Sequence, residues 1–332
     1  MASDAAFLLV SFGGPEGPDD VLPFLRNVTA GRNVPDARLA EVAAHYHLFG
    51  GVSPINSQCR ELLAAIERDF AASGIDLPVY WGNRNWHPFL ADTMRAMADD
   101  GIGTVVALAT AAYSSYSSCR QYLDDIDKAR AAVGARAPRV VKIPPYYWHP
   151  AFAASFTAAT ARALASLPPG VRDEAELVFT AHSIPVSMAA ASGPAGGAYE
   201  AQLAEVAGRV ASGVGRSGWK LAYQSRSGPP SVPWLEPDIN DCLTSLAKAG
   251  APAAVVVPIG FVSDHIEVVY DLDVEAARTA AGLGLEVARA ATPGTAPEFV
   301  TMISSLVGDA LAGVPGRADG RLCGEGCCRA TS

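Results

Sequence analysis

The chain has 332 residues, half of them hydrophobic, which is enough for two α/β domains or one large one with a substantial core. Its 25 basic and 34 acidic residues give a net charge of −9, which argues against a nucleic-acid-binding protein. No apolar run approaches the roughly 20 residues of a membrane span, and the N-terminus lacks the basic region of a signal peptide. We therefore expect a soluble, cytoplasmic protein whose six cysteines are free thiols or metal ligands.

Short apolar runs alternate with stretches of helix length along most of the chain. We expect strands at residues 7–12, 78–83, 104–109, 140–143, 177–181, 219–224 and 253–259, and a further short apolar segment at 283–287. We expect helices at residues 19–27, 36–49, 55–72, 87–100, 118–133, 149–166, 197–213, 238–249, 266–281 and 296–311. This alternation predicts an α/β fold with parallel sheets and right-handed crossovers.

Two runs of about four strand–helix units predict two similar halves. We place the first at residues 1–145 and the second at 146–295, followed by a C-terminal helix and a cysteine-bearing tail at 296–332. The proline-rich stretch at 144–150 is the best candidate hinge, because proline restricts both itself and the preceding residue.

His182 stands directly after the predicted strand 177–181 and before Ser-Ile-Pro. The C-terminal ends of strands in an open α/β sheet face the ligand crevice. A neutral imidazole there accepts a proton or binds a metal, although an isolated histidine at a strand end more often has a structural role.

Glu267 opens the helix that follows the predicted strand 253–259, and Asp271 and Glu275 follow it at i+4 and i+8. These spacings put three carboxylates on one helical face. The row is either a solvated acidic face or a path for a divalent cation or protons leading away from a catalytic glutamate. We expect Asp264 and His265 to cap and orient the helix start.

Other candidate ligand contacts are aromatic or stand next to glycine turns. The turn at 13–15 does not match Gly-x-Gly-x-x-Gly, so a dinucleotide site is rejected. Ser53 precedes a helix and is either an ordinary N-cap or a hydrogen-bond donor to a ligand carboxylate. Tyr122 ends a stretch rich in hydroxyls and aromatic rings that suits a flat, partly polar ligand. Phe12 and Tyr46 add flat surface, although each alone is more often a core residue.

Three cysteines crowd the C-terminal tail. Cys323, Cys327 and Cys328 form C-x3-C-C, a pattern that indicates a metal or cluster site. A [2Fe-2S] centre usually takes four thiolates, and Cys119 is the expected fourth ligand, with zinc as the competing interpretation. Adjacent cysteines on one cluster need strained local geometry. Cys59 and Cys242 fall within helical patterns, and we expect buried, inert thiols there.

Several of these stretches together resemble the ferrochelatases, and the match extends over nearly the whole chain. They are the opening strand and turn at 8–15, the loop at 50–55, and the motifs at 180–185, 223–226, 233–237 and 258–267. The resemblance implies two Rossmann-like domains, each with a mainly parallel four-stranded sheet flanked by helices, and a porphyrin between them.

The resemblance also implies roles for single residues. His182 and Glu267 are expected on the catalytic face and at the substrate iron, with Asp271 and Glu275 in a row that handles the ion or its protons. The implied porphyrin contacts are Phe12, His45, Tyr46, Ser53 and Tyr122. Two positions depart from some relatives: Phe12 replaces a tyrosine able to ligate iron, and His45 replaces an arginine, which changes propionate recognition.

The chain further resembles the bacterial branch that inserts Fe²⁺ into coproporphyrin III, and the subset that carries a [2Fe-2S] cluster, although its cysteine spacing differs from the animal pattern. The resemblance implies a monomer that hands its product to a coproheme decarboxylase. The alternatives are a protoporphyrin IX ferrochelatase, a cobalt chelatase, and a non-catalytic tetrapyrrole carrier or iron sensor.

Overall fold

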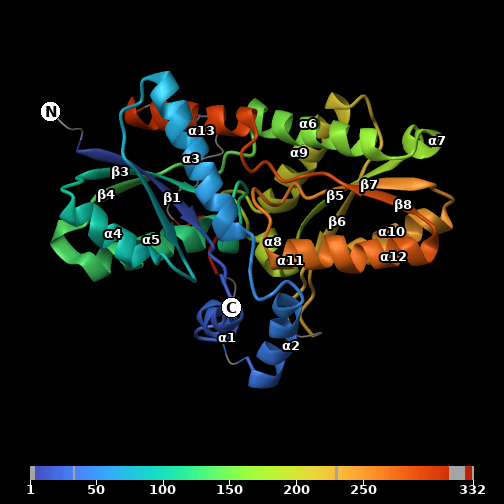
Figure 1. Ribbon diagram of the computed structural model, residues 1–332, viewed down its shortest axis with the longest axis horizontal. Coiled ribbons are helices and arrows are strands. Elements are labelled where there is room, and N and C mark those ends of the chain that lie inside the picture. The colour runs from blue at the N-terminus through green and yellow to red at the C-terminus, as the bar shows by residue number, and fades with distance from the viewer. Residues whose placement is uncertain (1–3, 33, 229–230, 314–325, 331–332) are drawn as a thin grey trace.

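Two parallel four-stranded sheets lie side by side in the computed structural model, which describes residues 4–32, 34–228, 231–313 and 326–330 (Figure 1). The first sheet has the order β2-β1-β3-β4 and the second the order β6-β5-β7-β8. Their strands are β1 (Ala5–Ser11), β2 (Val79–Asn83), β3 (Thr104–Ala109), β4 (Arg139–Lys142), β5 (Glu176–His182), β6 (Lys220–Gln224), β7 (Ala253–Val257) and β8 (Glu286–Arg289). The predicted α/β class with two parallel sheets is therefore confirmed.

Helices cover both faces of each sheet, so the central strands are apolar throughout. All residues of β1 and β7 are buried, the pattern expected of parallel strands covered on two sides. The covering helices are α3 (Ile55–Ser73), α4 (Leu90–Asp99), α5 (Gln121–Val133), α6 (Pro150–Ser166), α9 (Ala198–Gly213), α10 (Ile239–Lys248), α12 (Ala277–Leu283) and α13 (Pro297–Leu311). Short helices α7 (Pro169–Arg172) and α8 (Val186–Ala190) were not predicted from the sequence.

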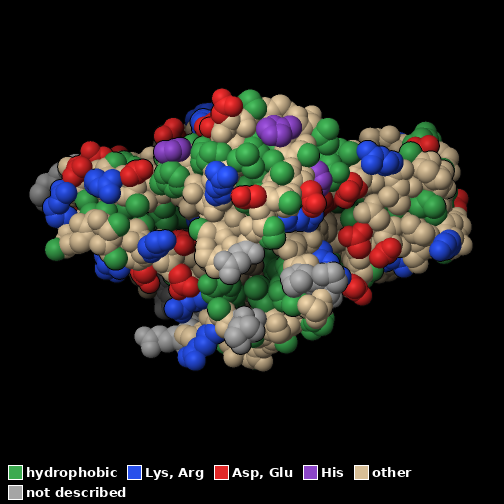
Figure 2. All heavy atoms as spheres, turned by 90° about the horizontal axis from the view of Figure 1, so that it is seen from below, with side chains coloured by type: hydrophobic (Ala, Val, Ile, Leu, Met, Phe, Trp, Pro, Cys, Tyr) green, Lys and Arg blue, Asp and Glu red, His purple; other side chains and the backbone are tan. Residues whose placement is uncertain are grey.

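Two helices stand apart from the sheets. Figure 1 shows α1 (Val21–Val28) and α2 (Asp36–His47) projecting from one side of the molecule, between the two halves. The surface seen from that side has basic and acidic side chains scattered among hydrophobic ones (Figure 2). Among the described residues, no helix is long and apolar enough to cross a membrane.

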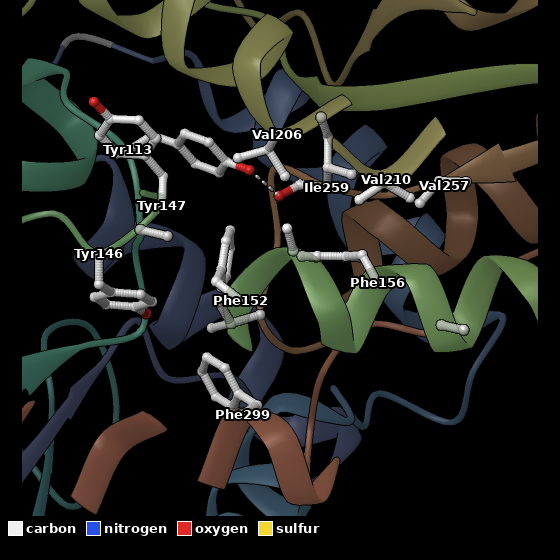
Figure 3. Packing of buried hydrophobic residues seen from close by; sticks show 14 of the residues in the cluster. Tyr113, Tyr146, Tyr147, Phe152, Phe156, Val206, Val210, Val257, Ile259 and Phe299 are labelled. Carbon is white, nitrogen blue, oxygen red and sulfur yellow. Dashed lines mark hydrogen bonds between the residues drawn. The ribbon is translucent and has the colours of Figure 1, made fainter. Parts of the chain in front are cut away.

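The two halves share one continuous hydrophobic core (Figure 3). The hydroxyl of Tyr113, which follows β3, donates to the carbonyl oxygen of Ile259, which follows β7, at 2.9 Å. Ser114 and Gln202 of α9 exchange two further hydrogen bonds, of 2.8 and 2.9 Å. These bonds tie the segment after β3 to the loop after β7 and to α9 of the second half.

The last helix, α13, packs against α3 of the first half and against α6. Ser304 and Thr301 of α13 donate hydrogen bonds to Asp69 of α3. The C-terminal helix thus joins the layer over the first sheet. The proposed division of the chain at residues 145 and 295 stays a prediction.

Candidate active site

His182 and Glu267 lie next to each other at the C-terminal edge of the second sheet. His182 is the last residue of β5, and Glu267 belongs to α11 (Ile266–Val269), which follows β7. The imidazole Nε2 is 3.4 Å from the carboxylate Oε2, and the two side chains keep 34% and 40% of their exposed surface. Adjacent parallel strands therefore deliver an imidazole and a carboxylate to one solvent-exposed point.

A glycine makes this approach possible. The backbone N–H of Gly260 donates to the carbonyl oxygen of Thr180 at 3.0 Å, so the loop after β7 lies directly against β5. A Cβ atom at position 260 would stand 2.7 Å from the Cα atom of Ala181. Only glycine allows the two backbones to come this close.

The orientation of His182 is fixed by contacts of its backbone and ring. Its Nδ1 lies 2.5 Å from the carbonyl oxygen of Ser183, which accepts a hydrogen bond from a protonated Nδ1. The hydroxyl of Tyr199 donates to the carbonyl oxygen of His182 at 2.9 Å. A protonated Nε2 points its N–H at the Glu267 carboxylate. When Nε2 gives up this proton, its lone pair can accept another proton or bind a metal ion.

The charges of this pair are coupled. Burial lowers the pKa of His182, but the hydrogen bond and charge of Glu267 outweigh it and raise that pKa above the ordinary 6.5. Burial raises the pKa of Glu267, yet the hydrogen bond from His182 and the charges of His265 and His45 bring it down to about 2. Glu267 is therefore a carboxylate at neutral pH, while His182 can carry or release a proton.

The carboxylate row is not on one regular helix, so the prediction of a single helix at 266–281 is wrong in its middle. Residues Tyr270–Ala276 form a π-helix between α11 and α12. Asp271 and Glu275 lie within this segment. Such π-helical turns occur mostly at functional sites, because the inserted residue changes where side chains point.

Asp271 is held from β6 and the residue after it. Gln224 Nε2 lies 3.5 Å from Asp271 Oδ2, and the hydroxyl of Ser225 donates to the same oxygen. Ser225 has a φ of 61°, a left-handed conformation that costs a residue with a side chain backbone energy. Burial raises the pKa of Asp271 to about 7, and repulsion by Glu267 and Glu275 adds to this against the hydrogen bond from Ser225.

The proposed porphyrin contacts form two groups. His45 stacks on Tyr270 with ring centroids 3.8 Å apart, and Tyr46 is buried beside it in α2. Phe12 and Tyr122 both contact the guanidinium of Arg84, at 5.7 and 4.6 Å from the ring centroids. Each group joins residues that are distant in the sequence.

Ser53 directly precedes the N-cap residue of α3 and is not the N-cap itself, which was one of its two interpretations. Pro54 is the N-cap residue of α3 and makes no side-chain cap hydrogen bond, so the N-cap interpretation of Ser53 is wrong. Ser53 is buried and packs against Gly14, where a Cβ atom would meet its side chain at 2.6 Å.

Arg84 and Arg289 were missed by sequence reasoning. The Arg84 side chain is 6% exposed, and its Nε lies 2.5 Å from Asp125 Oδ2. Each arginine stands at or just after the C-terminal end of a strand, which was the available signal. Asp264 and His265 provide no side-chain cap for α11; the Asp264 carboxylate binds Arg289 instead.

The described cysteines divide into two sets. Cys59 and Cys242 are buried within helices, as expected, and burial raises the pKa of each thiol. Cys119 is buried with Lys142 Nζ 3.8 Å from its sulfur. The sulfur of Cys328 accepts a hydrogen bond from the backbone N–H of Gly193 at 3.1 Å and lies 3.6 Å from that of Cys327.

The proposed cluster site is only partly described. Cys323 lies outside the described residues, and within them no group of three or more His, Cys, Asp or Glu residues forms a metal site.

Two surface hollows of about 410 and 450 Å³ contain none of the proposed site residues.

The comparisons with known proteins agree with this fold. Residues 4–311 match the family model described as Ferrochelatase. The chain belongs to the ferrochelatase family. It is 52% identical over 337 residues to the coproporphyrin III ferrochelatase of Nocardia farcinica, covering 97% of this chain and 96% of that protein. The Streptomyces griseus protein of that name is also 52% identical, with 98% and 93% covered.

A solved structure shows the same fold. The chain superimposes on SirB from Bacillus subtilis with Fe³⁺ at a TM-score of 0.56 and 11% identity, covering 94% of this chain and 99% of that one. This ferrochelatase-family chain is thus an enzyme of the metal-chelatase class with a chelatase-like fold.

We predict that the Asp271 carboxyl titrates near pH 7 in the metal-free protein. Because this pKa lies above the ordinary 3.8, the protonated form stabilises the folded state at low pH, and this advantage is lost as the pH rises through 7. The stability of Asp271→Asn relative to the wild type should therefore increase between about pH 4 and 7 and then level off. Denaturant unfolding at several pH values measures this; a difference constant with pH would contradict it.

Proposed function

We propose that this ferrochelatase-family enzyme inserts Fe²⁺ into coproporphyrin III, giving coproheme and releasing two protons. The relatives from Nocardia farcinica, Streptomyces griseus and Frankia alni carry the name coproporphyrin III ferrochelatase, at 52%, 52% and 55% identity. Coproporphyrin III and Fe²⁺ are then its substrates, and coproheme its product.

The observation that carries this proposal is the 3.4 Å contact between His182 and Glu267. Metallation requires the removal of two pyrrole N–H protons from the ring centre, and a positioned base lowers the barrier to each transfer. We propose that Nε2 of His182 takes a pyrrole proton and helps to position Fe²⁺. Glu267, which stays ionised, stabilises the imidazolium that results.

Asp271 and Glu275 extend the acidic row beyond Glu267. We propose that they supply the hydrated ion or drain the released protons. The raised pKa of Asp271, about 7, supports the second role, because a carboxyl that titrates near the working pH can both accept and release a proton.

The ring itself is proposed to rest against Phe12, His45, Tyr46, Ser53 and Tyr122. The stack of His45 on Tyr270 supports this, because it brings α2 to the start of the π-helix that carries Asp271. Contacts remote from the ring centre can bend the macrocycle and expose the nitrogen lone pairs.

Direct competition tests the choice of porphyrin. The protein is given Fe²⁺ with equal amounts of coproporphyrin III and protoporphyrin IX, and the two haem products are separated and quantified by their visible spectra. We expect kcat/KM to favour coproporphyrin III by about tenfold or more, because polar groups built to bind extra propionates are left unpaired by protoporphyrin.

Two other outcomes contradict this proposal. A preference for protoporphyrin IX would assign the protein to the other ferrochelatase branch. Porphyrin binding without metal insertion would make the protein a tetrapyrrole carrier.

We further propose that Cys119, Cys323, Cys327 and Cys328 hold a [2Fe-2S] cluster. Cys328 has a φ of 54°, a strained left-handed conformation of the kind that clusters at functional sites. The N–H of Gly193 donates to its sulfur, a bond that stabilises a thiolate. Ser117, two residues before Cys119, contacts Met188 in α8. Met188 lies five residues before Gly193, which binds Cys328, so Cys119 and Cys328 both lie near the segment 188–193.

Four thiolates and the amino group of Lys142 near Cys119 suit an iron–sulfur centre, which would pin the tail to the body of the protein. We expect freshly purified protein to absorb visible light. By chemical analysis it should contain about two iron atoms and two sulfide ions per chain, the composition of a [2Fe-2S] cluster. Cys328→Ser and Cys119→Ser should lose both signals, while Cys242→Ala, at a buried thiol outside the set, should keep them.

Zinc without sulfide in the wild-type protein would contradict the cluster and favour the zinc alternative. The expected monomer, the cytoplasmic location and the transfer of product to a coproheme decarboxylase stay predictions.

A further inference from the structure

We propose that Arg289 is a positioning residue that fixes both ends of the segment 264–273, which carries Glu267 and Asp271. It does so through two ion pairs, one with Asp264 before Glu267 and one with Asp273 between the carboxylates of the π-helix. This inference rests on the proposed function, because it concerns the same reaction.

Arg289 uses its whole guanidinium fork. Nη1 and Nη2 donate to the two carboxylate oxygens of Asp264 at 2.9 and 3.0 Å, and Nε lies 2.7 Å from Asp273 Oδ1. The side chains of Arg289 and Asp264 are only 21% and 14% exposed. A planar, bidentate pair of this kind specifies the relative orientation of its partners, which a single point charge does not.

The scaffold under Arg289 is well defined. Arg289 ends β8, which pairs with β7 in parallel register, with Arg289 opposite Val256. The loop that carries Asp264 leaves the same edge of the sheet after β7. The arginine therefore connects a fixed strand end to the segment that bears the proposed catalytic glutamate.

Asp264 is held from the other half of the molecule as well. Its backbone N–H donates at 2.8 Å to the side-chain oxygen of Gln58 in α3. Its carboxylate and its backbone are thus both bound, three residues before Glu267. Asp273 is bound two residues after Asp271, so Glu267 and Asp271 lie between two anchored points, and Glu275 lies just beyond the second.

Loss of the guanidinium leaves two carboxylates without their cation beside a site that is already acidic. Burial raises the pKa of Asp273, and the charge of Arg289 opposes this. Asp264 adds repulsion to the same group. Without Arg289 these charges separate by moving the backbone, which shifts Glu267 and Asp271 relative to His182. A displacement of about 1 Å at a reacting centre can cost about a hundredfold in rate.

The test compares Arg289→Ala and Arg289→Lys with Arg95→Ala, a matched control that breaks an exposed ion pair with Asp92. Iron insertion into coproporphyrin III is followed at saturating and limiting porphyrin, and porphyrin binding is titrated separately. We expect kcat of Arg289→Ala to fall by about 10- to 100-fold with KM for porphyrin within about twofold. The lysine variant should lie between, and the control should match the wild type.

Guanidinium at millimolar concentration gives a readout that a general loss of stability would not. It should restore part of the kcat of Arg289→Ala, because the small cation can occupy the vacated position between Asp264 and Asp273. Urea at the same concentration has a similar shape without the charge and should restore none.

Asp273→Asn offers a second variant whose side chain is 39% exposed, so folding should survive the change. Its kcat should fall by about fivefold, with KM for porphyrin unchanged. Wild-type kcat in Arg289→Ala, or a loss of kcat that guanidinium and urea affect alike, would overturn the inference. An inactive wild-type protein would instead overturn the proposed function, so the two failures are distinguishable.

Discussion

The close packing of Gly260 against β5 is the contact on which the candidate site depends. Parallel pairing brings the C-terminal ends of β5 and β7 to one edge, but pairing alone does not make their loops touch. The Gly260–Thr180 hydrogen bond, together with the absence of a Cβ atom on Gly260, places the loop after β7 directly against β5 just before His182. The preceding residue, Ile259, accepts the hydrogen bond from Tyr113, so one turn contacts both the strand that ends at His182 and the first half of the chain.

The acidic groups around this turn differ because their partners differ. Glu267 faces histidines and stays ionised to about pH 2, whereas Asp271 faces neutral hydroxyl and amide groups and holds its proton up to about pH 7. Asp264 and Asp273 are balanced by Arg289. Glu267, Asp271, Asp264 and Asp273 are therefore tolerated on one short segment, because they are neutralised by an imidazole, a proton or a guanidinium.

Sequence reasoning predicted the parts of this arrangement that follow from local pattern. The strand ends at His182 and before Glu267 were found, because buried runs and their polar stops are visible in the sequence. The π-helical segment was not, because the residue pattern of 7 residues does not reveal whether the backbone bonds over four residues or five. The contact of Ser225 with Asp271 in that segment is also long-range and invisible in the local pattern.

The roles of Arg84 and Arg289 could not be predicted from the sequence for the same reason, because their partners lie far away along the chain. Arg289 meets Asp264 from another strand, and Arg84 contacts Phe12 and Tyr122 from separate elements. Their positions at strand ends were visible, but their partners depend on sheet order, which the alternation of strands and helices does not specify. The fold class was therefore more accessible to prediction than the electrostatic network that surrounds the site.

The most direct measurement of the central claim separates porphyrin binding from metal insertion in His182→Ala. Coproporphyrin III is titrated into the variant and followed by its absorption spectrum, and iron insertion is then measured with the same preparation. The account predicts binding within about twofold of the wild type and insertion slowed by about 10²- to 10⁴-fold, the usual contribution of a positioned base. Insertion at the wild-type rate would contradict the assignment of His182 and, with it, the chemical role of its contact with Glu267.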